Sequence, residues 1–378
     1  MSLAAHHEQL RDAVRRYARA RLAPNAARWD REKSFPRDEV AGLGAMGLYG
    51  VAIPEAQGGA GMDSTALALA CEEISAGDGA SCTIVMVTNL VANILQGYGS
   101  EAQKKEFLAP MARGKALGAF CLTEPHAGSD AAAITTRAER SGAHYVLNGV
   151  KQFVTSGKNA DIAIVFAVTD KSAGKKGISA FVVPTSTPGY VVARIEDKTG
   201  QRASDTAQIV LENCKLPAAN LLSQEGAGYR IALANLESGR INVAAQATGM
   251  ARAALEAALA YAAERRSMGK PLIGHQAVNF RLADMATGVE ASRQLYLHAA
   301  RLKDSGAPCL KEASMAKLFA SETAEKVCSD AIQIHGGYGY VADFPVERIW
   351  RDVRVCQIYE GASDIQRLVI GRALEVAT

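Results

Sequence analysis

The stretch "RIALANLESGRINVAAQATGMARAALEAALAYAAERR" (residues 230–266) is rich in alanine and leucine and contains no proline. Alanine and leucine favour a helix, whereas proline would remove an intrahelical hydrogen bond, so this composition predicts one long helix. Two amphipathic stretches of similar texture follow at residues 278–303 and 311–334. Long helices joined by short connections favour an antiparallel four-helix bundle, which we expect to occupy residues 225–378.

The sequence changes in character upstream of this bundle. Residues 118–224 contain short segments rich in β-branched residues, such as "DIAIVFAVT" (161–169), which are separated by turn signals. Asn148-Gly149 lies between two of these segments and predicts a hairpin turn there. Residues 1–117 show the helical spacing of apolar residues instead. We therefore predict an α+β protein with an N-terminal helical domain, a middle β-barrel-like domain and a C-terminal four-helix bundle.

The composition argues against several classes of protein. Of the 378 residues, 48% are hydrophobic and 21% are charged, and a net charge of +3 indicates neither a nucleic-acid nor a membrane-surface partner. No apolar run reaches membrane-spanning length, and the N-terminus lacks the apolar core of a secretory signal. The 7 scattered cysteines form no CxxC pair, which favours a reducing compartment over disulfides or zinc. We expect a cytoplasmic protein without membrane insertion. We also expect no metal site, because no second ligand flanks His335 at metal spacing.

One glycine-rich match stands in the wrong context. "GLGAMG" (42–47) fits the dinucleotide-binding pattern GxGxxG. That pattern requires a strand before it and a helix after it, whereas here the preceding residues look helical and the following ones extended. We interpret these glycines as a place where two segments pack closely.

Two motifs of the middle domain allow a functional and a structural interpretation. "FCLTEPHAGSD" (120–130) begins as a strand and breaks at Pro125, so its main-chain N–H groups suit a phosphate or the edge of a flavin. An ordinary polar turn explains the same composition. Phe153 and Thr155 share one face of a strand, which suits stacking on a flat ring and donating a hydrogen bond to it. A core phenylalanine beside an edge threonine explains them equally well.

Four motifs of the helical region are equally ambiguous when taken singly. The arginines of "AERRSMGKPLIGHQ" (263–276) can bind phosphate or offset a helix dipole, and the glycines of "QIHGGYGY" (333–340) can cap a helix or admit a ligand. Glu237 and Arg240 in "LESGR" can pair on a solvated face. In "QIYEGASDIQRL" (357–368), Glu360 beside a glycine is usually a solvated loop residue.

Taken together and in this order, these motifs resemble the acyl-CoA dehydrogenase family, and most closely its short-chain and short-branched-chain members. The likeness extends from about Glu8 to Ala377 and is most specific in "LTEPHAGSD", "ESGRINVAAQATG" and "YGYVADFPVERIWRDVRVCQIYEGASDIQRLVIG". The resemblance implies a helix–β–helix fold, FAD as cofactor, and a fatty acyl-CoA thioester as substrate in β-oxidation. It also implies a homotetramer built as a dimer of dimers, and an electron-transfer flavoprotein as electron acceptor.

The resemblance assigns the cofactor and substrate residues. The FAD contacts of the chain itself would be Phe120, Leu122, Thr123, Gly128, Ser129, Phe153, Val154, Thr155, Ala362, Ser363 and Asp364. A neighbouring subunit would supply Arg265, Gln276, Gln333, Ile334, His335, Gly336 and Gly337 to the same FAD, and Met268 would be a further FAD contact. The substrate contacts would be Ser129, Glu237, Ser238, Gly239, Arg240 and Gly361. Many members have tryptophan in place of Phe153, and threonine is commoner where Ala362 stands.

The same resemblance makes Glu360 the catalytic base, which removes the α-proton of the thioester while a hydride leaves the β-carbon for flavin N5. Some members carry this base on the long helix instead, but the matching residue here is Gly239. An apolar acyl chain would desolvate the Glu360 carboxylate and raise its pKa towards that of the activated proton.

Two alternatives stay open at this point. An acyl-CoA oxidase would use oxygen as acceptor, although oxidases of this group usually carry an extra C-terminal domain. A non-catalytic acyl-CoA-binding protein on the same fold would have lost the base, whereas Glu360 is present. The sequence does not identify the acyl chain.

Overall fold

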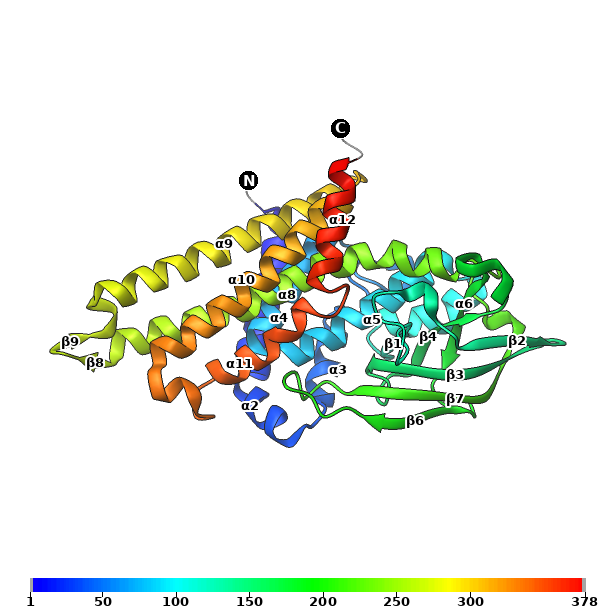
Figure 1. The fold of residues 1–378 in the computed structure, drawn as a ribbon, viewed down its shortest axis with the longest axis horizontal. Helices are drawn as coiled ribbons and strands as arrows, with labels where there is room; N and C mark the ends of the chain where they lie inside the picture. The colour runs from blue at the N-terminus through cyan, green and yellow to red at the C-terminus, as the bar shows by residue number, and fades with distance from the viewer. Residues whose placement is uncertain (1–2, 376–378) are drawn as a thin grey trace.

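The computed structural model describes residues 3–375. A curled sheet lies at one end of the long axis, the long C-terminal helices extend to the other end, and the N-terminal helices pack between and beside them (Figure 1). The N-terminal helices are α1 (Ala5–Tyr17), α2 (Ala23–Glu32), α3 (Arg37–Ala45), α4 (Ser64–Gly77), α5 (Gly79–Tyr98), α6 (Glu101–Gln103) and α7 (Ala109–Ala112). This order confirms the predicted α+β class and three-part architecture.

The middle part is a seven-stranded sheet with the strand order β1-β4-β2-β3-β7-β6, in which β5 also pairs with β4. β4 and β5 are buried almost throughout, because helices α5 and α8 cover this part of the sheet. β7 alternates buried and accessible residues over much of its length, as a strand with one core-facing side does. The strands are β1 (Gly118–Cys121), β2 (Arg137–Ser141), β3 (His144–Thr155), β4 (Ile162–Val168), β5 (Ile178–Pro184), β6 (Tyr190–Ile195) and β7 (Thr206–Pro217).

The hairpin predicted at Asn148-Gly149 is wrong, because β3 runs straight through both residues. The register between β3 and β7 shifts between Leu147 and Gly149, and the side chain of Asn148 accepts a 2.8 Å hydrogen bond from the Asn213 main chain. Gly149 has φ +152°, and a β-carbon there would lie 2.4 Å from Oγ1 of Thr136. The asparagine and glycine therefore form an irregularity inside a long strand, which pairing with β7 stabilises over a turn.

Three long helices dominate the C-terminal part, and α8 extends over 37 residues as the sequence predicts. The N-terminal helix α4 packs against both α8 and α9, so the two helical parts share one core. Helix α12 stands across the long helices (Figure 1). The C-terminal elements are α8 (Gly228–Glu264), β8 (Arg266–Ser267), β9 (Lys270–Pro271), α9 (Gln276–Asp304), α10 (Leu310–His335), η8 (Gly336–Tyr340), α11 (Val346–Val353), η9 (Arg354–Gln357) and α12 (Ser363–Glu375).

Helix α5 is long and apolar enough by composition to cross a membrane, which the sequence analysis missed. Most of its residues are buried inside the structure, between the sheet and α8. Its apolar character is therefore that of a core helix.

The "GLGAMG" glycines pack closely, as the sequence context indicates. Helix α3 ends within the motif, and a β-carbon on Gly44 would lie 2.8 Å from the Gly114 main-chain oxygen. A β-carbon on Gly42 would meet the Tyr17 hydroxyl at 2.0 Å. These glycines let segments approach each other and do not open a ligand site.

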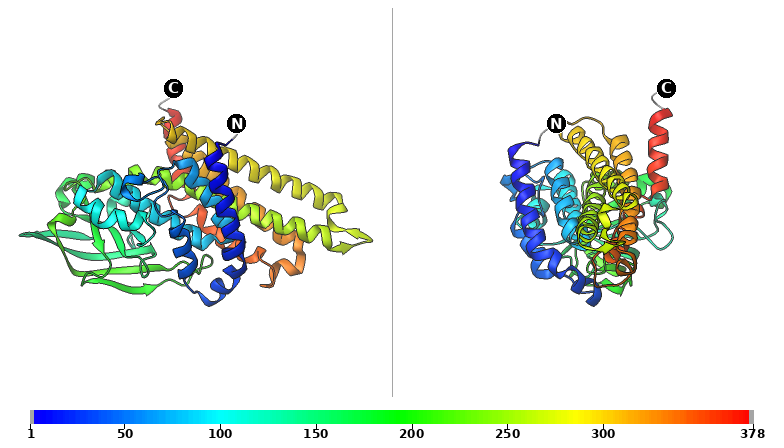
Figure 2. Two further views of the ribbon diagram at one scale, coloured as in Figure 1. Left: turned by 180° about the vertical axis from the view of Figure 1, so that it is seen from behind. Right: turned by 90° about the vertical axis from the view of Figure 1, so that its left-hand side faces the viewer.

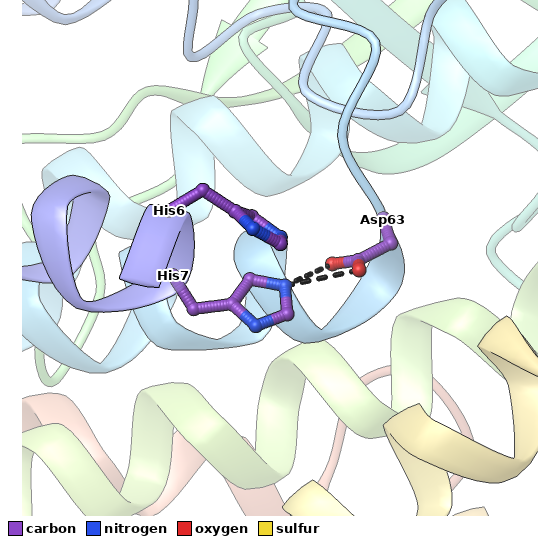
Figure 3. A group of neighbouring side chains, drawn as sticks. All are labelled: His6, His7 and Asp63. Carbon is purple, nitrogen blue, oxygen red and sulfur yellow. Dashed lines mark hydrogen bonds and ion pairs between the residues drawn. The ribbon is translucent and has the colours of Figure 1, made fainter. Parts of the chain in front are cut away.

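A histidine–aspartate pair fastens α1 to the start of α4 (Figure 3). Nε2 of His7 lies 2.8 and 2.9 Å from the two carboxylate oxygens of Asp63. The same carboxylate accepts a 2.8 Å hydrogen bond from the Ala66 N–H and caps α4. His6 lies near enough that the three side chains are able to hold a metal ion. The cap and the pairing with His7 already account for both oxygens of Asp63.

A buried carboxylate joins α4, α8 and α9. Glu72 is 3% exposed and accepts a 2.7 Å hydrogen bond from Nη2 of Arg293, while Nε of Arg252 lies 3.0 Å from it. Burial alone would raise the pKa of Glu72, but the hydrogen bond and charge of Arg293, the charge of Arg252 and the hydrogen bond of Tyr296 lower it overall. The helical core therefore depends on an ionised glutamate.

We predict that Glu72→Gln destabilises the protein by about 3 kcal/mol, because it leaves Arg293 without its buried partner and removes one of the two buried carboxylates that face Arg252. A depressed pKa contributes stability that is complete above the unfolded pKa and is lost as the pH falls through the folded one. The difference between variant and wild type should therefore shrink below about pH 4. Urea unfolding at several pH values measures it.

Glu290→Gln is the matched control, since Glu290 pairs with the same Arg293 at 2.5 Å but its side chain is 55% exposed. An exposed pair contributes less than about 1 kcal/mol. Equal losses for the two variants would contradict the role assigned to burial.

Candidate active site

Glu360 lies in the short connection between η9 and α12, where the backbone adopts an uncommon conformation. Its φ is +52° and that of the following Gly361 is +87°. A positive φ is costly for a non-glycine residue and persists only where the surroundings impose it. Helix α12 begins at Ser363. The strain points to a functional position for this carboxylate.

The Glu360 carboxylate lies against the long helix α8 at Gly239. A β-carbon on Gly239 would lie 2.3 Å from Oε2 of Glu360, so any other residue there would displace the carboxylate. Oε2 is buried and makes no hydrogen bond within residues 3–375. Burial raises the pKa of Glu360 to about 7, although the charges of Arg240 and Lys317 oppose the rise. A carboxylate that exchanges a proton near neutral pH has the property of a general base.

Two buried side chains donate hydrogen bonds to the Glu360–Gly361 turn. Nζ of Lys317, on α10, donates a 2.6 Å hydrogen bond to the Gly361 carbonyl. Nε2 of Gln366, on α12, donates to the carbonyls of Gly361 at 2.8 Å and Glu360 at 3.2 Å. Both side chains are fully buried. These donors explain how the turn keeps two consecutive positive φ angles.

A chain of hydrogen bonds fixes the residue before the carboxylate. The Tyr359 hydroxyl donates to the side-chain oxygen of Gln246 on α8. Gln246 in turn donates to Oγ1 of Thr83 on α5 at 2.7 Å, and Thr83 donates to Oε1 of Gln201 at 2.6 Å. Gln201 belongs to the loop between β6 and β7. The connection before α12 is thus tied to both the helical core and the middle domain.

Phe153 presents an exposed aromatic ring on the middle domain. It has φ +57°, lies where the register of β3 against β7 shifts, and its side chain is 63% exposed. The Gln152 N–H donates to the Thr123 carbonyl at 2.8 Å, so the two motifs of the middle domain lie side by side. Thr155 is half-buried beside it. An exposed ring held by a bulge provides a surface for a flat ligand.

The loop next to this ring is firmly anchored on one side and open on the other. Lys151 and Glu124 form a fully buried ion pair at 2.7 Å, and Glu124 also accepts from the main chains of Thr135 and Thr136. Gly128 and Ser129 are exposed, and a β-carbon on Gly128 would meet nothing within 4 Å. Phe120 is half-buried, while Leu122 and Val154 point into the core and offer a ligand only their main chains.

The third group of predicted residues lies at the opposite end of the molecule. β8, β9 and the end of α10 are remote from the sheet in Figures 1 and 2. There the Arg265 guanidinium lies 5.7 Å from the centre of the Tyr338 ring, and Met268 is 92% exposed. The structure brings Arg265, Met268, Gln276 and the Gln333–Gly337 segment to one end, but not to Phe153 or Glu360 of the same chain.

Two members of this group are buried. His335 stacks on Tyr261 with ring centres 4.3 Å apart, and burial lowers its pKa. Ile334 is also buried. Their side chains serve packing, and only their main chains and the glycines that follow are available to a ligand.

Four of the predicted substrate residues, Glu237 to Arg240, lie on α8. Oε1 of Glu237 lies 3.2 Å from both Nζ of Lys303 and Sγ of Cys309. Ser238 is half-buried, and Arg240 is buried with one bond of 3.3 Å to Ser314. Glu237 is therefore bound by Lys303 of α9 and Cys309 at the start of α10, so it is not free to act as a base.

The residues present fit a bound flavin dinucleotide and a thioester. Oγ of Ser363 and Oε2 of Glu360 are both buried without a hydrogen-bond partner among the described residues, as groups that await a polar ligand are. Ala362 is half-buried and Asp364 exposed beside them. Phe153 supplies an aromatic surface, and the open backbone at Gly128 admits a phosphate or ring edge.

The sequence analysis missed Lys317 and Gln366. A signal for Lys317 was present, since it lies on the same helix face as Ala313, Ala320 and Ala324, all of which are buried. A lysine on an apolar face is unusual unless it has a specific partner. Gln366 gives no such signal, because its partners are main-chain carbonyls of the preceding turn.

Comparison with known proteins covers nearly the whole chain. Three domain models of the acyl-CoA dehydrogenase family match: the N-terminal domain at residues 4–115, the middle domain at 119–214 and the C-terminal domain at 226–375. An acyl-CoA dehydrogenase of Bacillus subtilis is 47% identical over 99% of each chain. The rat mitochondrial short-chain specific acyl-CoA dehydrogenase is 46% identical over 96% of this chain and 89% of its own.

A solved structure shows the same fold. The butyryl-CoA dehydrogenase of Megasphaera elsdenii matches with a TM-score of 0.97 and 40% identity over 99% of both chains. Family models, relatives and fold therefore agree with one another. The chain belongs to the acyl-CoA dehydrogenase family, and it is an oxidoreductase of that family.

Proposed function

We propose that the protein removes two hydrogens from the α and β carbons of a short-chain or short-branched acyl-CoA and yields the trans-2-enoyl-CoA, with FAD as cofactor. The observation that carries the proposal is the Glu360 carboxylate, which is buried against Gly239 and has a pKa raised to about 7. A base of this kind suits abstraction of a weakly acidic α-proton. The short-chain relative and the butyryl-CoA dehydrogenase structure support the substrate class.

The chain's own residues prepare the thioester for reaction. Glu360 takes the α-proton on its partnerless Oε2, next to the space left by Gly239. The positive charges of Arg240 and Lys317 keep this carboxylate partly ionised despite its burial. Phe153, Thr155, Gly128, Ser129 and Ser363 would hold FAD, which when bound supplies the acceptor for the β-hydride. Main-chain donors at the Glu360 turn would stabilise the negative charge on the thioester oxygen.

We also propose a homotetramer, built as a dimer of dimers. The argument is geometric: Arg265, Met268, Gln276 and Gln333–Gly337 resemble FAD contacts, yet they lie at the end of the molecule remote from Phe153. One chain is unable to bring both groups to one cofactor, so a neighbouring chain would have to supply the second group.

We also propose an electron acceptor and a cellular location for the protein. The relatives are named dehydrogenases, which favours an electron-transfer flavoprotein over oxygen as acceptor. The seven cysteines are buried and unpaired, which supports the cytoplasm as location. The presence of Glu360 argues against a non-catalytic binding protein.

We predict that Glu360→Gln retains the fold, FAD and acyl-CoA binding but loses flavin reduction by at least 10²–10⁴-fold, since an amide accepts no proton. For the wild type, the rate should fall as the pH drops below about 7, because protonation of Glu360 removes the base. Anaerobic stopped-flow bleaching by butyryl-CoA between pH 5.5 and pH 9 measures both effects. Bleaching of Glu360→Gln at the wild-type rate would place the base elsewhere.

We predict that Gly239→Ala also loses most flavin reduction, because its β-carbon would lie 2.3 Å from Oε2 of Glu360 and push the carboxylate aside. Gly371→Ala is the control, since Gly371 lies in α12 and a β-carbon there would meet nothing within 4 Å. Only the first variant should lose bleaching rate while both keep their FAD. Normal bleaching in Gly239→Ala would show that the carboxylate does not work from this position.

We predict that Arg265→Ala loses FAD more readily than wild type while its melting temperature changes little. Arg266→Ala is the control, because this neighbouring arginine donates to the Gly269 carbonyl at 2.9 Å and has no proposed FAD contact. Gel filtration followed by flavin quantification compares the two, and light scattering gives the oligomeric state. A stable monomer with stoichiometric FAD would rule out the shared site.

A further inference from the structure

Lys317 is a buried cation without an ionic partner. Its side chain is fully buried within α10, and Nζ makes one hydrogen bond of 2.6 Å, to the carbonyl of Gly361. No carboxylate of the described residues forms an ion pair with it. Burying an unpaired ammonium group is strongly unfavourable, so packing alone does not account for a lysine where methionine would fit.

The hydrogen bond of Lys317 goes to the turn that carries Glu360. The ammonium group reaches the carbonyl directly after Glu360, while Gln366 donates to that carbonyl at 2.8 Å and to the Glu360 carbonyl at 3.2 Å. One donor is therefore charged and the other neutral. Both stabilise the same two positive φ angles. They differ only in what their charge does to the carboxylate.

We infer that Lys317 is a positioning residue for Glu360: it fixes the Glu360–Gly361 turn through the Gly361 carbonyl, and its charge keeps the buried carboxylate ionised at neutral pH. The inference rests on the proposed function in that it treats Glu360 as the base. Nothing in Lys317 touches the reacting atoms. It acts through the geometry and charge state of Glu360.

The charged groups around Glu360 agree with this role. Two charges act on the carboxylate itself, those of Arg240 from α8 and Lys317 from α10. Glu237 acts on Arg240 instead, and Glu322 and Cys356 act on Lys317. Burial raises the pKa of the Cys356 thiol to about 12, so this group is neutral. From α12, Gln366 carries no charge. Burial lowers the pKa of Lys317 to about 8, so it is still largely a cation at neutral pH.

Two variants separate charge from hydrogen bonding. Lys317→Met removes the charge and the donor with little change of shape, whereas Gln366→Leu removes only neutral donors to the same turn. If Lys317 merely filled space, Lys317→Met would leave the protonation of Glu360 unchanged. Lys317→Gln, which removes the charge and keeps a polar amide, serves as a second variant should the methionine form fold poorly.

The test measures the protonation of Glu360 directly. Infrared difference spectra of the holoenzyme without substrate, from pH 5.5 to 9, report the protonated carboxyl band that Glu360→Gln lacks. We expect Lys317→Met and Lys317→Gln to move the midpoint up by about one pH unit or more, as loss of a nearby opposite charge does. Gln366→Leu should leave the midpoint in place. The pH profile of anaerobic bleaching should move with the infrared midpoint.

Each outcome supports or overturns the inference about Lys317. A wild-type midpoint in both Lys317 variants would overturn the inference, as would an equal shift in Gln366→Leu, which would make the hydrogen bonds rather than the charge responsible. If the wild type is not bleached by any acyl-CoA, the proposed function fails. The infrared titration would still show whether Lys317 controls the Glu360 carboxylate.

Discussion

The structure depends on one close contact, in which a carboxylate is pressed against the backbone of a helix. Glu360 reaches α8 only because Gly239 has no side chain, and a β-carbon there would lie 2.3 Å from Oε2. This contact removes water from the carboxylate and raises its pKa to about 7. The long proline-free helix α8 is thus also a wall of the site. A break in α8 at this point would remove both the fold's longest element and the environment of the base.

The structure around that contact contains several features that are locally unfavourable. Two consecutive positive φ angles, a buried lysine without a carboxylate and a buried Oε2 without a hydrogen bond are each unfavourable. They persist because Lys317 and Gln366 bind the turn from two different helices, and because Tyr359 is tied through Gln246 to α5. Unfavourable features that cluster at one point are typical of a functional site, where geometry matters more than local stability.

Sequence reasoning predicted what depends on periodicity and composition. The helix–sheet–helix order and the single helix at residues 228–264 follow from local pattern, and the structure agrees. Local reasoning failed where a tertiary contact decides: Asn148-Gly149 reads as a turn, yet pairing of β3 with β7 holds it inside a strand. The role of Gln366 could not be predicted from the sequence, because its hydrogen-bond partners are main-chain atoms. The motif residues lie in separate groups, and no one-dimensional pattern shows that the group around Arg265 lies at the end of the molecule remote from the sheet that carries Phe153.

The remaining question is what sets the distance between the ring of Phe153 and the carboxylate of Glu360, which belong to different parts of the fold. Each is rigid in its own part: the Lys151–Glu124 pair anchors the first, and Lys317 with Gln366 anchors the second. The two parts meet at the loop between β6 and β7, where the main chain and side chain of Gln201 donate to Asp352 at the end of α11. A β-carbon on the adjacent Gly200 would lie 2.2 Å from the Arg351 carbonyl, so this junction tolerates no added side chain. Because Gln201 also accepts from Thr83, which binds Gln246, the same residues that hold Tyr359 hold the sheet in place. This buried junction therefore contributes to the spacing between the base and the aromatic surface, together with the packing of α5 and α8 on the sheet.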